Sequence, residues 1–156
     1  SLTGHLVFST LHTNSAVGAV TRLRDMGVEP FLLSSSLMGV LAQRLVRVLC
    51  NDCKDPYTAG QSDCQMLGVA EDKPLTLYHA RGCAHCKQLG YRGRTGIYEL
   101  VEINDTLRTM IHDGEGEQAM ERLAREDSTA MRQDGWGKAL QGITSVEEVL
   151  RVTQGN

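Results

Sequence analysis

The sequence predicts an α/β protein that carries a small metal-binding module and ends in a helical region. Three observations support this fold class. An apolar run rich in β-branched and aromatic side chains precedes helical stripes, two paired cysteine motifs follow, and capped amphipathic stretches fill the rest of the chain. Apolar residues make up 41% of the 156 residues, which is a normal share for a globular protein.

The first part of the chain is predicted to contain a strand followed by two helices. Residues 5–11 are expected to form a buried strand, because β-branched and aromatic side chains dominate this run. Asn14 and its polar neighbours suit a helix N-cap, and the apolar positions behind them predict a helix over residues 17–26. Leucines at helical spacing predict a second helix over residues 31–48. Residues 1–48 are therefore expected to form half of an α/β domain.

Two C-x2-C motifs, separated by residues 54–82, are the most informative feature of the chain. Paired motifs of this kind are typical of a tetrahedral site of four sulfurs, which prefers zinc. Two disulfides, or buried thiols that pack as small apolar side chains, are the alternatives. No stretch of the sequence resembles a signal peptide, and Cys64 is an odd fifth cysteine that we expect to be a packed thiol, which argues against disulfides. His79 and His85 are expected to lie outside the ligand set. The predicted metal ligands are Cys50, Cys53, Cys83 and Cys86.

The metal module is predicted to span residues 49–90, with a short helix near residues 62–67 and a strand at residues 75–79. Residues 91–156 are expected to contain a strand at residues 95–101 and then helices only. Four helices are predicted, starting near Asn104, Glu117, Thr129 and Ser145. The last of them begins with a capping-box pattern, Ser145-x-x-Glu148.

Composition and charge exclude two classes of partner. The net charge is −3, and acidic and basic residues around the cysteines are nearly balanced, so we expect no nucleic acid partner. The longest apolar stretch, residues 31–42, is broken by serines and is shorter than the ~20 residues that a membrane helix needs. The sequence also has no G-x4-G-K-[ST] phosphate loop and no acidic Mg²⁺ ligand at the end of an apolar strand. The 156 residues alone are thus expected to lack a complete active site.

Polar residues near the predicted strands are candidates for binding phosphate. His12 follows the first predicted strand and precedes a helix N-terminus, a position where α/β proteins bind ligands. A structural histidine bonded to a loop carbonyl is the alternative, and position alone favours it. His5 is expected to brace the same strand. Arg92 and Arg94 lie between glycines and suit a phosphate or a carboxylate, although their position alone favours a solvated basic turn.

Several segments together resemble the secretion ATPase superfamily, the hexameric motors of type II secretion and type IV pili. The segments that carry the resemblance are Leu2–Asn14, which is similar to the histidine box of that superfamily, and residues 19–27, 42–46, 93–99 and 142–145. Paired C-x2-C motifs occur in its type II secretion and pilus-assembly branches, and residues 15–49 resemble the type II secretion branch (general secretion pathway protein E family) more closely.

The resemblance implies that the chain is the C-terminal part of a RecA-like NTPase domain with an inserted tetracysteine zinc module and a C-terminal helical subdomain. In that scheme the ATPase-domain portion with the histidine box ends at residue 48, the zinc module at residue 90 and the helical subdomain at residue 156. His12 would lie near the γ-phosphate of ATP as a catalytic residue, with His5 as the second box histidine. Arg22 and Arg94 would approach the nucleotide or the neighbouring subunit's site. The chain begins without methionine, and the Walker motifs that bind ATP and Mg²⁺ would lie upstream of it, so this piece alone is expected to be inactive.

The resemblance also implies partners and a location. The parent protein would be a cytoplasmic homo-hexamer at the inner membrane that contacts the cytoplasmic parts of the secretion platform and couples ATP hydrolysis to pseudopilus assembly. Two alternatives remain open at this point: an ATPase for type IV pilus assembly, and a stand-alone zinc-binding interaction module.

Overall fold

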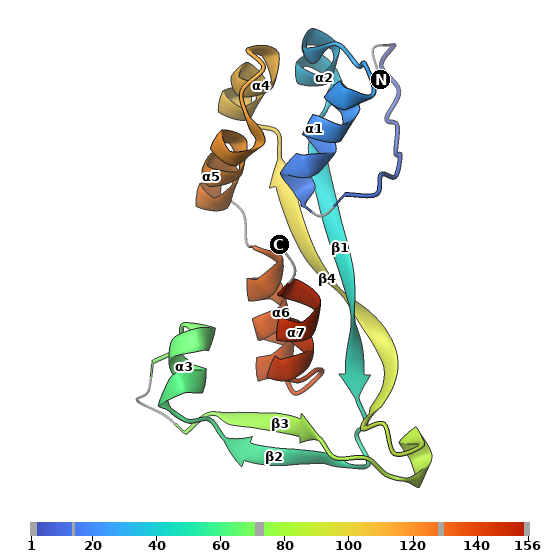
Figure 1. The fold of residues 1–156 in the computed structure, drawn as a ribbon, viewed down its shortest axis with the longest axis vertical. Helices are drawn as coiled ribbons and strands as arrows, with labels where there is room; N and C mark the ends of the chain where they lie inside the picture. The colour runs from blue at the N-terminus through green and yellow to red at the C-terminus, as the bar shows by residue number, and fades with distance from the viewer. Residues whose placement is uncertain (1–2, 14, 71–73, 128–129, 155–156) are drawn as a thin grey trace. The chain divides into compact units, whose positions relative to one another are not determined.

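The computed structural model describes residues 3–13, 15–70, 74–127 and 130–154 (Figure 1). The chain divides into two compact units. The first unit comprises Ser1–Ala42 and Glu99–Ala130, and the second unit comprises Gln43–Tyr98 and Met131–Asn156. Within the described ranges there are two two-stranded sheets, in which β1 pairs with β4 and β2 pairs with β3.

The described residues form both helices and strands. They are α1 (Ala16–Asp25), α2 (Pro30–Ser36), β1 (Gly39–Leu49), β2 (Lys54–Thr58), α3 (Gln61–Leu67), β3 (Thr76–Ala80), the 3₁₀ turn η1 (Ala84–Cys86), β4 (Tyr91–Glu102), α4 (Asp105–His112), α5 (Glu117–Asp127), α6 (Met131–Leu140) and α7 (Val146–Thr153). Among these elements, no helix combines the length and the apolar character that crossing a membrane requires.

The first unit packs four helices around one apolar core. α1 packs against α5, and α2 packs against α4. Ser15 caps α1, since its Oγ accepts a hydrogen bond from the backbone N–H of Gly18 at 3.0 Å. Asn104 caps α4 in the same way, as the sequence predicts. The core residues are Ala16, Val17, Val20, Leu33, Val101, Ile103, Leu107, Ile111, Met120 and Ala124.

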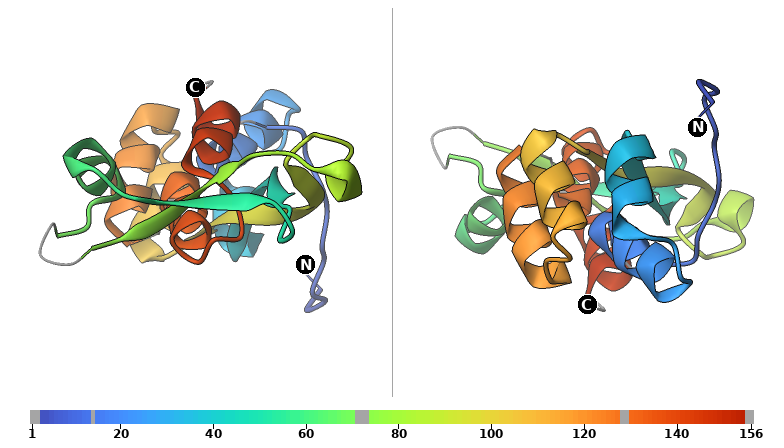
Figure 2. Two further views of the ribbon diagram at one scale, coloured as in Figure 1. Left: turned by 90° about the horizontal axis from the view of Figure 1, so that it is seen from below. Right: turned by 90° about the horizontal axis from the view of Figure 1, so that it is seen from above.

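The second unit combines a β-ribbon with two helices. β2 and β3 pair in antiparallel fashion, with Lys54 opposite Ala80, and α6 packs against both β3 and α7. In the left view of Figure 2, β2 and β3 cross in front of α6. Gly135 lets α6 and α7 approach closely, because a Cβ on it would lie 2.6 Å from Val149 Cγ1. The core residues are Leu67, Leu77, Trp136, Ala139, Val146 and Val149.

The predicted buried strand at residues 5–11 is wrong. This segment has no strand structure, and its apolar side chains are exposed, with Phe8 88% accessible. An extended segment satisfies its backbone N–H and C=O groups through a neighbouring strand. Neither of the two sheets in the described ranges includes residues 5–11. Of the three residues expected to suit the N-cap, Thr13, Asn14 and Ser15, Ser15 caps α1, and Asn14 falls outside the described residues.

The predicted helix over residues 31–48 is also wrong, because it is a short helix followed by a long strand. α2 ends at Ser36, and Leu37 has extended backbone angles (φ −76°, ψ 125°). The hydroxyls of Ser35 and Ser36 donate to carbonyls of the preceding turn, which competes with continued helix. Successive residues from 39 to 46 alternate between exposed and covered, as a strand requires.

The remaining elements largely follow the sequence predictions. α3, β3 and the helices α4 and α5 occupy the predicted places, and α6 begins at Met131. β4 is longer than the predicted residues 95–101, and β2 was not predicted. Pro and Asp lie in the middle of β2, so this segment lacks the alternation of apolar residues that predicts a strand.

Candidate metal centre and the predicted nucleotide residues

The four predicted cysteine ligands lie together at one end of the second unit. Their Sγ atoms all lie within 4.8 Å of one another, and Cys50 and Cys86 are buried while Cys53 and Cys83 are partly exposed. Measured distances between Sγ atoms are 3.9 Å for Cys50 and Cys83, 3.8 Å for Cys53 and Cys86, and 3.7 Å for Cys83 and Cys86. All four are free thiols. The prediction of a four-cysteine cluster is confirmed.

These spacings fit a tetrahedral metal ion. Zn–S bonds of about 2.3 Å in a tetrahedron place the sulfurs about 3.8 Å apart, whereas a disulfide brings two sulfurs to about 2.05 Å. The distances between the sulfurs therefore suit a soft divalent ion better than disulfides.

Two tight turns bring the cysteines together. The first turn follows β1, where the backbone N–H groups of Cys53 and Lys54 both donate to the carbonyl of Cys50. The second turn contains η1 and ends at Gly90, whose φ of +75° a side chain would strain. A Cβ at Gly90 would also lie 2.7 Å from the Cβ of Ala80. The backbone N–H of Cys50 donates to the Gly90 carbonyl at 2.9 Å, which joins the two turns.

The sulfurs differ in how the backbone stabilises their thiolate forms. Burial raises the pKa of Cys86, but its Sγ accepts hydrogen bonds from the N–H groups of Cys83 and Gly90, each at 3.2 Å, and the pKa falls to about 6. Burial and the neighbouring sulfurs raise the pKa of Cys53 to about 12. Four sulfurs at this spacing become thiolates together only when a cation compensates their charge. The donor set thus fits a thiolate-binding metal.

Two histidines and the fifth cysteine lie outside the cluster. His85 is exposed and its Nδ1 lies 3.1 Å from Asp52 Oδ2, and the same carboxylate oxygen lies 3.8 Å from Cys50 Sγ. His79 is exposed, stacks on the ring of Tyr57 and pairs with Glu147. Cys64 is buried in α3 and does not belong to the cluster, as predicted.

The residues predicted to approach nucleotide are all exposed. His5 and His12 lie on the extended first segment, Arg22 lies on α1 and Arg94 on β4. His5 Nδ1 lies 3.1 Å from Thr3 Oγ1. Side chains of His12, Arg22 and Arg94 make no hydrogen bond or ion pair with another described residue, so nothing in the described ranges brings them together.

The N-terminus of α1 is filled by the protein's own side chains. Ser15 Oγ, besides capping the helix, lies 3.3 Å from Glu117 Oε1. The carboxylate of Glu99 accepts a hydrogen bond from the backbone N–H of Ala16; burial nevertheless raises the pKa of Glu99. Because these acidic groups occupy the first turn, the expectation that this turn binds a phosphate has no support from the geometry.

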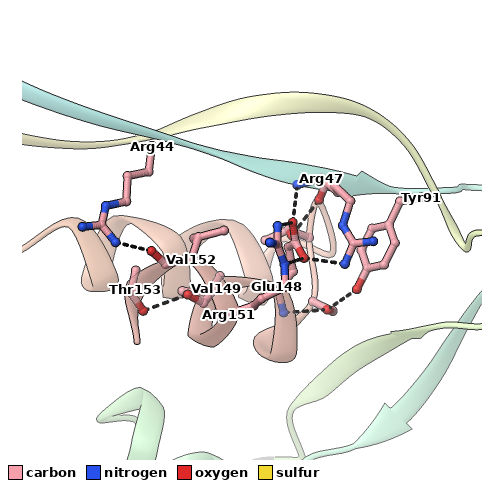
Figure 3. A network of polar contacts seen from close by, with 10 residues as sticks. Arg44, Arg47, Tyr91, Glu148, Val149, Arg151, Val152 and Thr153 are labelled. Carbon is pink, nitrogen blue, oxygen red and sulfur yellow. Dashed lines mark hydrogen bonds and ion pairs between the residues drawn. The ribbon is translucent and has the colours of Figure 1, made fainter. Parts of the chain in front are cut away.

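Glu148, which the sequence indicated only as part of a capping box, is a buried carboxylate in the second unit (Figure 3). The predicted capping box is half correct: Ser145 Oγ accepts from the N–H of Glu148, but the Glu148 side chain turns away. It accepts hydrogen bonds from Arg47 Nη2 at 2.6 Å and from Arg151 Nε at 2.8 Å. Burial raises the pKa of Glu148, but the hydrogen bonds from Arg151 and Arg47 outweigh it, and the pKa falls to about 2. The sequence offers one signal for this role: Glu148 is an acidic residue on a helix face that is otherwise apolar.

Sequence comparison gives the family. Residues 1–151 match the family model described as "Type II/IV secretion system protein". The chain is 64% identical over 154 residues to "Type II secretion system protein E" of Pseudomonas aeruginosa, covering 99% of this chain and 31% of that protein. It is 61% identical over 154 residues to "Type II secretion system ATPase E" of Vibrio cholerae, covering 99% of this chain and 31% of the relative. A third relative, "Type II secretion system protein E" of Dickeya dadantii, is 58% identical over 154 residues, with coverage of 99% and 30%.

The chain thus spans less than a third of the length of these curated relatives. The match extends over nearly all of its own residues. The chain therefore belongs to the type II/IV secretion system protein family.

Proposed function

We propose that this chain is a C-terminal part of an ATPase that powers type II protein secretion, and that it contains the metal module of that motor. The observation that carries the proposal is the 61% identity, over 99% of this chain, to a relative named as a type II secretion ATPase. In this proposal the chain completes a RecA-like domain with residues 1–48, adds the metal module at residues 49–90 and ends in a helical subdomain over residues 91–156.

The proposed metal is zinc, held by the four cysteines. The distances between the sulfurs and the absence of disulfides among them support this choice. A zinc ion in a closed site of four thiolates supplies folding energy rather than reactivity. The residues that bind it fix the two turns around it, so the module would hold its shape without a large apolar core.

The proposed nucleotide residues act on ATP and Mg²⁺ bound by the rest of the parent protein. His12 would contact the γ-phosphate during transfer, with His5 supporting the same segment, and Arg22 and Arg94 would approach the nucleotide. Their exposure, and the lack of polar partners for His12, Arg22 and Arg94 among the described residues, supports this role, because such groups are available to a ligand or a second subunit.

The proposed assembly is a homo-hexamer at the cytoplasmic face of the inner membrane, in contact with the secretion platform. A role in type IV pilus assembly is the second candidate, because paired C-x2-C motifs also occur in the pilus-assembly branch of the secretion ATPase superfamily that the sequence resembles. The names of the three relatives reported above all refer to type II secretion, which favours a role in type II secretion. A stand-alone zinc module is disfavoured, because the family match extends over residues 1–151 and is not confined to the cysteines.

A genetic test separates the two candidates. Deletion of the gene from its own bacterium should abolish the release of type II secretion substrates into the medium and leave type IV pili intact. A plasmid copy should restore secretion. Loss of pili with normal secretion would contradict the proposal and favour the pilus-assembly candidate.

A further inference from the structure

The N-terminal end of α7 contacts both chain segments that bear the metal centre. We call Thr144, Ser145 and Glu148 the α7 polar cluster. All three are buried, with 0%, 1% and 1% of their surface exposed. The entering segment, residues 47–50, leads from β1 to the first cysteine turn, and the leaving segment, residues 90–91, leads from the second turn into β4.

The entering segment is held by backbone hydrogen bonds. Glu148 Oε1 accepts from the backbone N–H of Arg47 at 3.0 Å, and Thr144 Oγ1 donates to the Arg47 carbonyl at 2.8 Å. The N–H of Leu49 donates to the carbonyl of Ile143 at 2.8 Å. Leu49 directly precedes Cys50, so these contacts fix the backbone that orients the first metal ligand.

The leaving segment is held through Tyr91. Its hydroxyl lies 2.7 Å from Ser145 Oγ, which also accepts from the N–H of Glu148 at 3.2 Å. The Arg47 guanidinium, itself bonded to Glu148, stacks over the Tyr91 ring with its carbon 4.1 Å from the centroid. Figure 3 shows the carboxylate of Glu148, the Arg47 guanidinium and the Tyr91 ring meeting at one place.

Both held segments connect directly to metal ligands. The N–H of Cys50 donates to the Gly90 carbonyl at 2.9 Å, and the N–H of Gly90 donates to Cys86 Sγ at 3.2 Å. A shift of either segment therefore moves one sulfur from each C-x2-C motif. Such outer contacts orient ligands and tune metal affinity.

Packing alone does not explain a carboxylate at this place. The Glu148 side chain has no exposed surface, and desolvating a carboxylate is unfavourable unless every lone pair is used. An apolar residue would fill the volume without fixing the orientation of the Arg47 backbone. The hydrogen bonds of Glu148 therefore act on geometry as well as on stability.

We propose that the α7 polar cluster, with Glu148 at its centre, positions the four cysteines for the metal. Glu148 is a positioning residue that acts through Arg47 and Tyr91. The inference rests on the proposed binding of zinc by the cysteines.

The test measures zinc affinity in the 156-residue chain by competition with a chromophoric chelator, and the ligand-field bands of the Co²⁺-substituted protein. Glu148→Gln should weaken zinc binding about tenfold and shift the Co²⁺ bands. Tyr91→Phe removes one hydrogen bond and should weaken binding about threefold. This second variant decides the question if Glu148→Gln does not fold.

The matched control is Leu67→Ala, which shortens a buried core side chain on α3 and lowers stability without changing a hydrogen bond of the α7 polar cluster. It should bind zinc within about twofold of the wild type at a similar loss of melting temperature. The proposal is overturned if folded Glu148→Gln, or Tyr91→Phe, binds zinc like the wild type with unchanged Co²⁺ bands. Equal weakening by Leu67→Ala would also overturn it. Failure of the wild type to bind zinc would instead overturn the metal centre itself, and the inference with it.

Discussion

Individual residues of the cysteine cluster have different environments although their sequence motifs are identical. Cys86 receives two backbone hydrogen bonds and has a pKa of about 6, whereas the pKa of Cys53 is about 12. The spacing of the motifs predicts the clustering of the four cysteines, because C-x2-C turns impose local geometry. It does not predict which sulfur is the stabilised thiolate, since the N–H of Gly90 comes from outside the motif.

Replacing one ligand should abolish the metal site, whereas replacing the fifth cysteine should not. We expect Cys86→Ser to reduce bound zinc from about one ion per chain to well below that value, because a closed site needs four sulfurs. Cys64→Ser is the matched control, since Cys64 is buried in α3 outside the cluster. Elemental analysis of the purified, reduced variants checks this. Zinc loss in the Cys64→Ser variant would mean that the ligand set is wrong.

His12 should act on turnover more than on nucleotide affinity. In the full-length protein, His12→Ala should lower kcat about tenfold to a few hundredfold, equivalent to roughly 1–3 kcal/mol, because one contact to the γ-phosphate is lost in the transition state. Affinity for ATP should change less, since a phosphate loop and Mg²⁺ provide most ground-state binding. Steady-state kinetics and nucleotide titration measure both quantities.

The control for this variant is His112→Ala, because His112 is an exposed histidine at the end of α4. It should leave turnover unchanged. A His12→Ala protein that forms the same oligomer and hydrolyses ATP at the parental rate would assign His12 a structural role.

At the level of elements, the N-termini of two helices were predictable, and the pairing partner of a strand was not. Asn104 and Ser145 cap α4 and α7 because capping is decided within one turn of the chain. Residues 31–48 misled the prediction, since leucines four apart suit a helix and the same run also alternates as a strand. The choice depends on pairing with β4, which the local sequence does not encode.

The contact of α7 with β1 likewise depends on tertiary structure. By its sequence position, Glu148 fits a capping box. Arg47 and Arg151, however, form stronger hydrogen bonds with a charged carboxylate than one backbone N–H does. Arg47, about 100 positions from Glu148 in the sequence, thus determines the conformation of the Glu148 side chain.

This contact should make the second unit sensitive to acid. The pKa of Glu148 lies at about 2, below its ordinary value of 4.5, so its ionised form stabilises the fold. That stabilisation is complete above about pH 5 and is lost as the pH falls from 4.5 through 2. Solvent screening of the two partly exposed arginines limits it to about 2 kcal/mol. Urea unfolding followed by the fluorescence of Trp136, across this pH range, measures the effect.

The matched variant for acid sensitivity is Glu147→Gln, which removes the neighbouring exposed carboxylate that pairs with His79. Glu148→Gln should be less stable at pH 7 and should show a flatter stability profile between pH 5 and 2, whereas Glu147→Gln should retain the wild-type slope. Equal slopes in the wild type and in Glu148→Gln would show that the buried ion pair does not contribute this term.

For the whole molecule, two separate cores imply two different responses to metal loss. The described core of the first unit contains no cysteine, whereas the second unit contains all four ligands. Chelation of the metal should therefore speed amide hydrogen exchange in residues 49–90 and leave α4 and α5 protected. Uniform acceleration across both units would contradict a metal centre that stabilises only its own unit.

The central claim is that four cysteines bind one zinc ion. X-ray absorption at the zinc edge, combined with elemental analysis of the reduced 156-residue chain, tests it most directly. The account predicts one zinc per chain surrounded by four sulfurs at about 2.3 Å. Absence of zinc, or a disulfide between Cys50 and Cys53 in protein prepared under reducing conditions, would contradict it.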